Sequence, residues 1–375
     1  MHIVQLITER ERRGAQVFAR QLSEQLMERG HQITFLSLYK AEGNEMGAPD
    51  GATVIDLGHA RNIPLSPALL RDLVDQLRAE PPDLVQANGS DTLKYSVLAK
   101  MLLWADWPLA YRNIGYASDW VGDRPLRRVI SKILLQAVDR VISVCDATRS
   151  DFIETYDLPS SKVVSIPIGT EIPEEVDRSG ARKKLSKVAG LPLDFSGPIL
   201  VHAGSFAPVK NHEGLLRIFR RVLDKIPEAQ LVLFGNGPLW NEINNLVSQC
   251  GLEEHVHLPG NVEGVAALMV GADLMLLPSK TEGLPGVVLE ASAHQVPCVA
   301  YDVGGIKEAI RQGETGVLVP KDDEDAFARS IMELLSDSER RSDMGAAAQE
   351  LVARNYTLEA VGKRFDIEYV KLLEQ

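Results

Sequence analysis

A chain of 375 residues is longer than one hydrophobic core usually serves, so two domains of roughly 180 residues each are expected. Hydrophobic residues make up 45% and charged residues 25% of the chain, proportions typical of soluble globular proteins. The net charge of −12 gives no basic field that would attract nucleic acid, so a nucleic-acid partner is not expected.

Apolar runs typical of buried strands alternate with amphipathic helical patterns along the chain, which predicts parallel α/β structure. A helix is expected over residues 16–29, closed by Gly30. Prolines and glycines interrupt this alternation of strand and helix patterns between residues 166 and 198. The expected strands are 3–7, 33–38, 53–57, 84–86, 109–112, 140–144 and 163–166 before this break, and 199–204, 230–234, 255–257, 274–277, 298–301 and 316–319 after it.

This order of elements predicts two doubly wound, Rossmann-like domains in tandem. Ligands in such sheets bind beyond the carboxyl ends of the strands, and we expect the two crevices to face each other across a cleft. The expected boundaries are residues 1–170 for the first domain, 171–198 for a connection, 199–355 for the second domain, and 356–375 for a C-terminal helix that packs back toward the first domain.

The three cysteines, Cys145, Cys250 and Cys298, lie far apart and lack the spacing of metal ligands. A sparse, odd number argues against a disulfide framework or a zinc site and fits a reducing cytoplasm. The N-terminal sequence becomes charged at Glu9, too early for a signal peptide, and no apolar stretch has the length of a membrane span. We therefore expect a cytoplasmic protein, peripheral at the inner face of a membrane at most.

Residues 278–291 carry the clearest chemical pattern. They follow an apolar strand, and Pro285 suits the first turn of a helix. The free N–H groups near Gly286 to Val288, with the helix dipole, form an anion site suited to a diphosphate. Glu282 lies in the loop, and Glu290, about one turn into the helix, is placed to accept from two ribose hydroxyls. An isolated glutamate is more often simply solvated, but the strand, loop and helix around this pair favour a ligand site.

Two glutamates eight residues apart in this setting resemble the E-x7-E element of the retaining glycosyltransferases of family 4, which have the GT-B fold. Residues 234–238, 297–308 and 313–319 are also similar to that family. The resemblance implies that Glu282 lies by the transferred sugar and Glu290 holds the nucleotide ribose. The donor-binding residues that it implies in this segment are Gly283, Leu284, Gly286, Val287 and Glu290.

Residues 203–211 resemble the family's second diphosphate-binding element. Gly204 and Lys210 match the family pattern, whereas Ser205 stands where an arginine is usual, so one bidentate contact to the diphosphate is lost. The resemblance makes Lys210 both a catalytic and a donor-binding candidate. It adds Gly204, Ser205 and Gly235 to the donor-binding set.

The first domain matches the family less well. Gly14 takes the place of the second glycine of a pair that approaches the diphosphate, and Arg13 stands at the first. Arg12 or Arg13 is a candidate replacement for the arginine missing at Ser205. The loops where the family often has a histidine contain Asn88 and Asn113 instead. Neither asparagine can shuttle a proton, and Asn113 is our third catalytic candidate, with Glu282 and Lys210. Ile168 also departs from the family pattern.

Three other features have competing interpretations. Residues 322–325, Asp-Asp-Glu-Asp, cap a helix beginning near Ala326 rather than bind a metal. Residues 124–132 are basic with interleaved apolar residues, which suits an anionic bilayer but also an ordinary solvated helix face. His202 ends a buried strand and is either a core residue or a lining residue of the cleft.

By resemblance, the protein is a retaining hexosyltransferase of polysaccharide biosynthesis. It moves a sugar from a nucleotide diphosphate-sugar, with a UDP-sugar favoured, to a hydroxyl of a glycan, a lipid-linked acceptor or a small molecule, without a metal or other cofactor. Two alternatives stay open: a GT-B-fold nucleotide-sugar 2-epimerase, and a non-catalytic relative that binds nucleotide-sugar.

Overall fold

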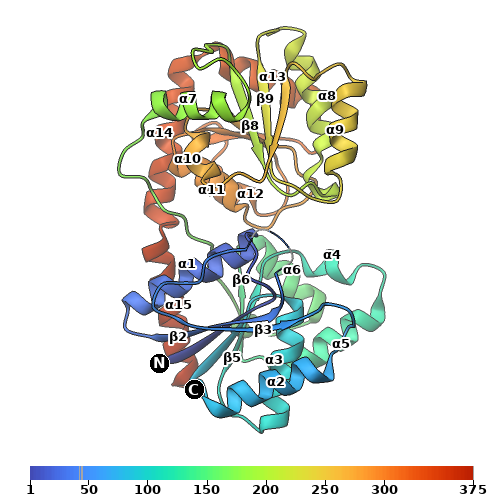
Figure 1. The fold of residues 1–375 in the computed structure, drawn as a ribbon, viewed down its shortest axis with the longest axis vertical. Helices are drawn as coiled ribbons and strands as arrows, with labels where there is room; N and C mark the ends of the chain where they lie inside the picture. The colour runs from blue at the N-terminus through green and yellow to red at the C-terminus, as the bar shows by residue number, and fades with distance from the viewer. Residues whose placement is uncertain (42, 44, 375) are drawn as a thin grey trace. The chain divides into compact units, whose positions relative to one another are not determined.

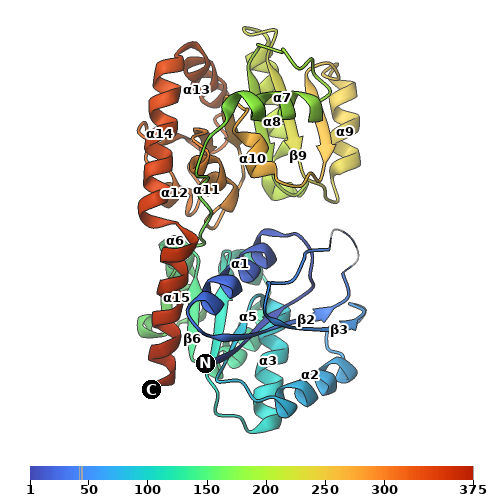
Figure 2. The same cartoon turned by 60° about the vertical axis from the view of Figure 1, so that its left-hand side comes forward.

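A computed structural model describes residues 1–41, 43 and 45–374. The chain divides into two compact units, one made of residues 1–169 with the C-terminal segment from Leu358, and one made of residues 170–357. Each unit contains one wholly parallel sheet with helices on both faces (Figures 1 and 2). The prediction of an α/β fold with two doubly wound sheets is confirmed.

The first unit contains a seven-stranded sheet in the order β3-β2-β1-β4-β5-β6-β7. Its strands are β1 (His2–Ile7), β2 (Gln32–Tyr39), β3 (Thr53–His59), β4 (Leu84–Ala87), β5 (Leu109–Asn113), β6 (Arg140–Ser143) and β7 (Val163–Ser165). Its helices are α1 (Gly14–Glu28), α2 (Pro67–Ala79), α3 (Ser90–Leu103), α4 (Ala117–Val121), α5 (Pro125–Gln136), α6 (Asp146–Tyr156), the 3-10 turn η1 (Ser160–Lys162) and α15 (Leu358–Leu373).

Two apolar layers cover the faces of this sheet, because side chains alternate between faces along each strand. One layer joins Ile3 of β1 to α1 and to α15 through Phe18 and Phe365, whose ring centroids are 5.8 Å apart. The other joins Val4 of β1 to α2, α3 and α6. The helix α15 therefore belongs to the first unit, and it lies beside α1 in Figure 2.

The second unit contains a six-stranded sheet in the order β10-β9-β8-β11-β12-β13. Its strands are β8 (Ile199–Ala203), β9 (Gln230–Phe234), β10 (Val256–Gly260), β11 (Leu274–Leu277), β12 (Cys298–Tyr301) and β13 (Gly316–Val319). Its helices are α7 (Arg178–Val188), η2 (Pro208–Lys210), α8 (His212–Leu223), α9 (Trp240–Gln249), α10 (Val265–Met269), α11 (Gly286–Ala293), α12 (Ile306–Ala309), α13 (Glu324–Ser336) and α14 (Ser338–Asn355). Helix α8 packs with α9 and α13, whereas α11 packs with α10 and α14 on the other side of the sheet (Figure 1).

The segment 171–198 differs from the expected connection. It belongs to the second unit and contains α7, whose Asp177 accepts from the Gly180 N–H at 2.9 Å. Arg182 anchors the helix by donating to the Gly271 carbonyl at 2.7 Å and to Asp273 at 2.9 Å. The helix is rich in lysine and arginine and has only two buried apolar residues, Ala181 and Leu185, so its periodicity is weak beside the flanking prolines and glycines.

The segment 322–325 caps a helix as expected, because Asp323 accepts from the Ala326 N–H at 2.8 Å at the start of α13. All three cysteines are free. No helix among the described residues is long and apolar enough to cross a bilayer.

Candidate functional site

The candidate donor site lies at the point where the strand order of the second sheet reverses. Strand β8 pairs with β9 on one side and with β11 on the other, so the loops after β8 and β11 leave the same edge of the sheet side by side. Ligands of open α/β sheets bind at such a point. These two loops carry Lys210 and Glu282.

An ion pair joins the two loops. The Lys210 Nζ lies 2.5 Å from the Glu282 Oε1, and the two side chains are only 17% and 11% exposed. Asn211, in the left-handed conformation with φ of 57°, donates through its Nδ2 to the Pro278 carbonyl at 3.1 Å. The Lys280 N–H donates to the Val209 carbonyl at 2.8 Å. These bonds hold a cation and a carboxylate from distant parts of the sequence at one place.

The N-terminus of α11 lies in the loop after β11. Pro285 is the N-cap, one residue before the helix, and no side chain caps this end. The Val288 N–H donates to the Pro285 carbonyl at 3.1 Å, so the expectation that it is free is wrong. The N–H groups of Gly286 and Val287 have no acceptor among the described residues. Two backbone donors and the positive end of the helix dipole are therefore available to an anion.

Glu290 follows on the fifth residue of α11. Burial raises the pKa of its carboxyl group, because a charged carboxylate loses hydration there. Within the described residues, no hydrogen bond or ion pair engages the Glu290 side chain. A desolvated carboxylate without a partner is costly, and it is typical of a group that binds a ligand.

The predicted glycines of this site have different environments. A Cβ at Gly235, whose φ is 123°, would lie 2.0 Å from the Gly204 carbonyl oxygen, so the two backbones approach too closely for any side chain at 235. The Gly204 N–H donates to the Phe234 carbonyl at 3.0 Å. Gly235 thus shapes the loop that carries Gly204, and its contact with a donor stays a prediction.

Other predicted residues of the second unit surround the same loops. Ser205 is exposed, and its N–H has no backbone acceptor among the described residues. The Gly305 N–H donates at 3.2 Å to the carbonyl of Glu282, just before Gly283, and Leu284 is buried. The fold thus brings Gly204, Ser205, Lys210, Gly235, Glu282, Gly283, Leu284, Gly286, Val287 and Glu290 to the carboxyl edge of one sheet.

The remaining predicted residues lie in the first unit. Gly14 is the first residue of α1, and a Cβ there would meet nothing within 4 Å. Arg13 pairs with Glu9 at 3.1 Å and Glu11 at 2.7 Å, so its charge is already engaged in this unit. Asn113 is buried and donates to the Ser143 Oγ at 3.3 Å, a bond that ties β5 to β6.

The site also contains buried polar side chains that the sequence motifs did not identify. The sequence predicts His202 as either a core residue or a lining residue of the cleft, and it indicates no role for His212 or Ser279. The imidazoles of His202 and His212 lie edge to face with centroids 4.9 Å apart. The atoms His202 Nε2, His212 Nδ1, His212 Nε2 and Ser279 Oγ are buried and have no hydrogen-bond partner in the part of the chain that the structure describes. The sequence signal for the two imidazoles is a histidine on each side of the 203–211 segment.

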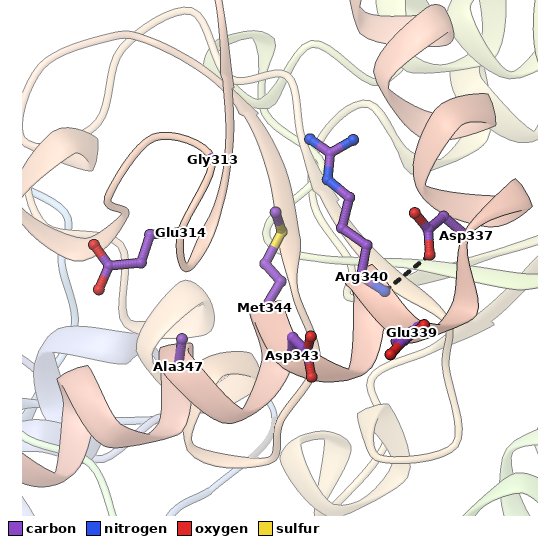
Figure 3. Close-up of a pocket in the computed structure, with 8 residues that line it drawn as sticks. All are labelled: Gly313, Glu314, Asp337, Glu339, Arg340, Asp343, Met344 and Ala347. Atoms are coloured by element: carbon purple, nitrogen blue, oxygen red, sulfur yellow. Dashed lines mark hydrogen bonds between the residues drawn. The ribbon is translucent and has the colours of Figure 1, made fainter.

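A pocket of the second unit lies away from this site. It has a volume of about 540 Å³ and is lined by the loop before β13 and the start of α14 (Figure 3). Its Asp337 carboxylate accepts from the Arg340 backbone N–H at 2.9 Å and caps α14. None of the predicted site residues lines this pocket.

Comparisons with known proteins identify the family. Residues 187–351 match the family model described as glycosyl transferases group 1, and residues 12–172 match that of glycosyltransferase family 4. The chain is 28% identical over 369 residues to the N-acetyl-alpha-D-glucosaminyl L-malate synthase of Bacillus anthracis, covering 96% of this chain and 94% of that protein. It is 29% identical over 249 residues to a GDP-mannose-dependent alpha-(1-6)-phosphatidylinositol monomannoside mannosyltransferase of Mycolicibacterium smegmatis, covering 64% of each.

Solved structures share the fold. The HepE protein of Anabaena in complex with UDP-glucose superimposes with a TM-score of 0.82 at 19% identity, over 99% of this chain and 100% of that one. The sucrose-phosphate synthase of Thermosynechococcus elongatus gives a TM-score of 0.81 at 21% identity, over 100% and 99%. With both halves matched by models of one enzyme family, the chain belongs to the family 4 glycosyltransferases, nucleotide-sugar-dependent enzymes of the GT-B fold.

Proposed function

We propose that the second unit binds a nucleotide diphosphate-sugar at the carboxyl edge of its sheet. The observation that carries the proposal is the carboxylate of Glu290, partly buried and unpaired among the described residues, one turn after the uncapped start of α11. Its two oxygens accept from the ribose hydroxyls, which supply the missing partners. The free N–H groups of Gly286 and Val287 bind the diphosphate, together with the Lys210 ammonium.

In this proposal Glu282 lies beside the transferred sugar and accepts from its hydroxyls. Lys210 and the start of α11 stabilise the negative charge that develops on the leaving diphosphate. The anomeric configuration is retained, and an oxygen of the departing phosphate takes the proton of the acceptor hydroxyl. No histidine of the first unit is then needed as a base, which fits the asparagines at 88 and 113.

Positive groups of the protein replace a metal in this scheme, so we expect transfer to continue in the presence of EDTA at a rate within about twofold of the untreated enzyme. A uridine donor is proposed, because HepE is known in complex with UDP-glucose. The acceptor is proposed to be a glycan, a lipid-linked sugar or a small hydroxy compound, and to bind the first unit. The mannosyltransferase and the malate synthase are relatives whose acceptors by name are a lipid and a hydroxy acid.

Turnover tests the proposal directly. The chain is incubated with UDP-, GDP- and ADP-sugars and a panel of acceptors, and products are identified by NMR. A glycoside with the anomeric configuration of the donor supports the proposal. An epimerised nucleotide-sugar formed without acceptor would instead identify a 2-epimerase, and nucleotide-sugar binding without any product would identify a non-catalytic relative.

A peripheral membrane contact through residues 124–132 forms the second part of the proposal. Of the twelve residues of α5, only Leu135 is buried. Leu126, Val129, Ile130 and Ile133 have helical spacing and are 70%, 54%, 49% and 59% exposed, so they form an apolar stripe that faces solvent. Arg124, Arg127, Arg128 and Lys132 flank it. A solvent-facing apolar stripe beside basic side chains is typical of helices that lie on anionic bilayers.

Sedimentation with vesicles tests this contact. The parent chain is expected to sediment with vesicles of phosphatidylglycerol and phosphatidylcholine, and to do so less with phosphatidylcholine alone. Ile130→Glu should reduce sedimentation by about tenfold, because it places a carboxylate in the inserted stripe. Leu193→Glu, at a 57% exposed leucine of the second unit, is the matched control and should change nothing. Equal sedimentation of the Ile130→Glu and Leu193→Glu variants would contradict a membrane contact. So would a dimer of the parent chain that Ile130→Glu dissociates, because the apolar stripe would then be covered by a second copy.

A further inference from the structure

His202 is a buried polar side chain near the end of β8, the strand that precedes the loop of Gly204 and Lys210. Its Nδ1 lies 2.9 Å from the Leu276 carbonyl oxygen, so Nδ1 carries the proton and donates across to β11. Burial, and next to it the positive charge that His212 would carry, lower the pKa of His202 to about 3. The ring is therefore neutral, and the lone pair on Nε2 is an acceptor for which no described residue supplies a donor.

The His202 Nε2 and the Lys210 side chain both lie close to Gly204. A Cβ placed on Gly204 would lie 3.4 Å from the His202 Nε2 and 3.4 Å from the Lys210 Cε. The Nε2 and Cε atoms are thus at most about 6.8 Å apart. When the Lys210 ammonium turns toward the histidine, the Cε–Nζ bond of about 1.5 Å shortens this to at most about 5.3 Å, a gap that one water molecule can bridge with two hydrogen bonds of about 2.8 Å. His202 Nε2 is thus an unused acceptor next to the side chain that is proposed to bind the diphosphate.

His212 fixes the ring of His202. As the first residue of α8 it stacks on Phe206, with centroids 4.1 Å apart and planes at 18°. It meets His202 edge to face at 85°. Together with the Nδ1 bond to Leu276, this contact sets the plane of the His202 ring and the direction of its Nε2.

We propose that His202 is a positioning residue for Lys210, whose ammonium donates to the His202 Nε2, directly or through one water, when a donor is bound. This inference rests on the proposed function. Without a ligand, Lys210 is paired with Glu282. A bound diphosphate competes for the ammonium, and Glu282 is then free to accept from the sugar. A carboxylate would cancel the positive charge of the ammonium. A neutral imidazole holds the ammonium and leaves that charge available to the phosphates.

Three substitutions separate this role from simple core packing. His202→Asn keeps a donor at the position of Nδ1, and so the bond to Leu276, but has no acceptor at the position of Nε2. His202→Phe removes both groups and keeps the ring volume. His202→Gln places an amide oxygen near the position of Nε2. The control is Ser186→Ala, which deletes another buried, unpartnered polar atom of the second unit in α7.

The experiment measures UDP and GDP affinity by calorimetry, and KM and kcat for donor turnover, in each variant and in a Lys210→Met background. His202→Asn and His202→Phe are expected to lower nucleotide affinity and raise the donor KM about tenfold, as expected for loss of a hydrogen bond to a charged group. His202→Gln should restore both to within about threefold, and Ser186→Ala should leave both unchanged. In Lys210→Met, His202→Asn should have less than about a twofold effect, because the histidine acts through the lysine.

An equal loss of affinity with and without Lys210, or unchanged affinity of His202→Asn in the parent chain, would overturn the role of His202 while leaving the proposed function intact. Failure of the parent chain to bind either nucleotide would contradict the proposed donor class, and this inference with it. Thermal unfolding of every variant shows that the fold is kept at the temperature of the measurement.

Discussion

The Glu290 carboxylate is partly buried, and no side chain among the described residues compensates its charge. Such a group lowers the stability of the free protein and is useful only when a ligand supplies donors, so function and stability oppose each other at this residue. Because burial raises the pKa of Glu290, the folded state binds more protons there than the unfolded state does. Stability is therefore lost as the pH rises from the ordinary pKa of a carboxyl group through the raised pKa of the folded state.

Glu290→Gln is expected to stabilise the ligand-free protein at neutral pH, because it keeps the shape and removes the desolvated charge. The midpoint of thermal unfolding of the second unit should rise by about 2 °C at pH 7. The gain should vanish at a pH below the ordinary carboxyl pKa, where both residues are uncharged. A lower midpoint for Glu290→Gln at pH 7 would show that the carboxylate has a stabilising partner.

The elements that carry the site depend on close contact between backbones. The loop after β8 passes directly over the start of the loop after β9, where Gly235 and Gly237 have φ of 123° and 159°. A Cβ at Gly237 would lie 2.7 Å from the Phe206 nitrogen. Residues 204–206 are therefore set in place by glycines of the neighbouring strand end.

Gly235→Ala is expected to destabilise the second unit by about 3 kcal/mol, from backbone strain and from collision with the Gly204 carbonyl. It should also weaken nucleotide binding, since it displaces the loop of Gly204. The matched control is Gly251→Ala, where φ is 63° but no atom lies within 4 Å of the new Cβ. Denaturant unfolding measures both variants, and equal losses of stability would contradict the collision.

All thirteen expected strands are present. Most of them are buried on both faces of a parallel sheet and form apolar runs that stand out in sequence, whereas the edge strand β3 is exposed or half-buried along its length. Helix α7 was missed, since its contacts with the second unit come largely from the charged side chain of Arg182. At the site, the order of strands brings Lys210 near Glu282, and this proximity could be predicted from the sequence. The ring nitrogens of His202 and His212 that lack partners among the described residues could not be predicted, because their burial depends on the packing of loops from distant segments.

At the scale of the whole molecule, the chain ends in the unit where it began. Helix α15 contributes Val361, Phe365, Tyr369 and Leu372 to an apolar layer of the first sheet. Tyr369 also donates through its hydroxyl to Gln86 of β4. The stability of the first unit therefore depends on the last residues of the chain.

Phe365→Ala is expected to cost the first unit about 3–5 kcal/mol, because it opens a cavity between α15 and α1. Three of the four tryptophans, Trp104, Trp107 and Trp120, lie in this unit and Trp240 lies in the other, so tryptophan fluorescence reports mainly the first unit. Ile367→Ala, at a 46% exposed position of the same helix, should cost much less. Nucleotide affinity of Phe365→Ala below its unfolding temperature should remain within about twofold of the parent value, because the proposed donor residues belong to the other unit.

The role of Glu290 is tested most directly by calorimetric titration of the parent chain and of Glu290→Gln with a nucleoside diphosphate and with its 2′,3′-dideoxy form. If Glu290 accepts from the ribose hydroxyls, the substitution should lower affinity for the natural nucleotide by about tenfold to a hundredfold. The dideoxy form should bind both proteins with the same, weaker affinity. Unchanged affinity of Glu290→Gln for the natural nucleotide would contradict the donor site assigned to the second unit.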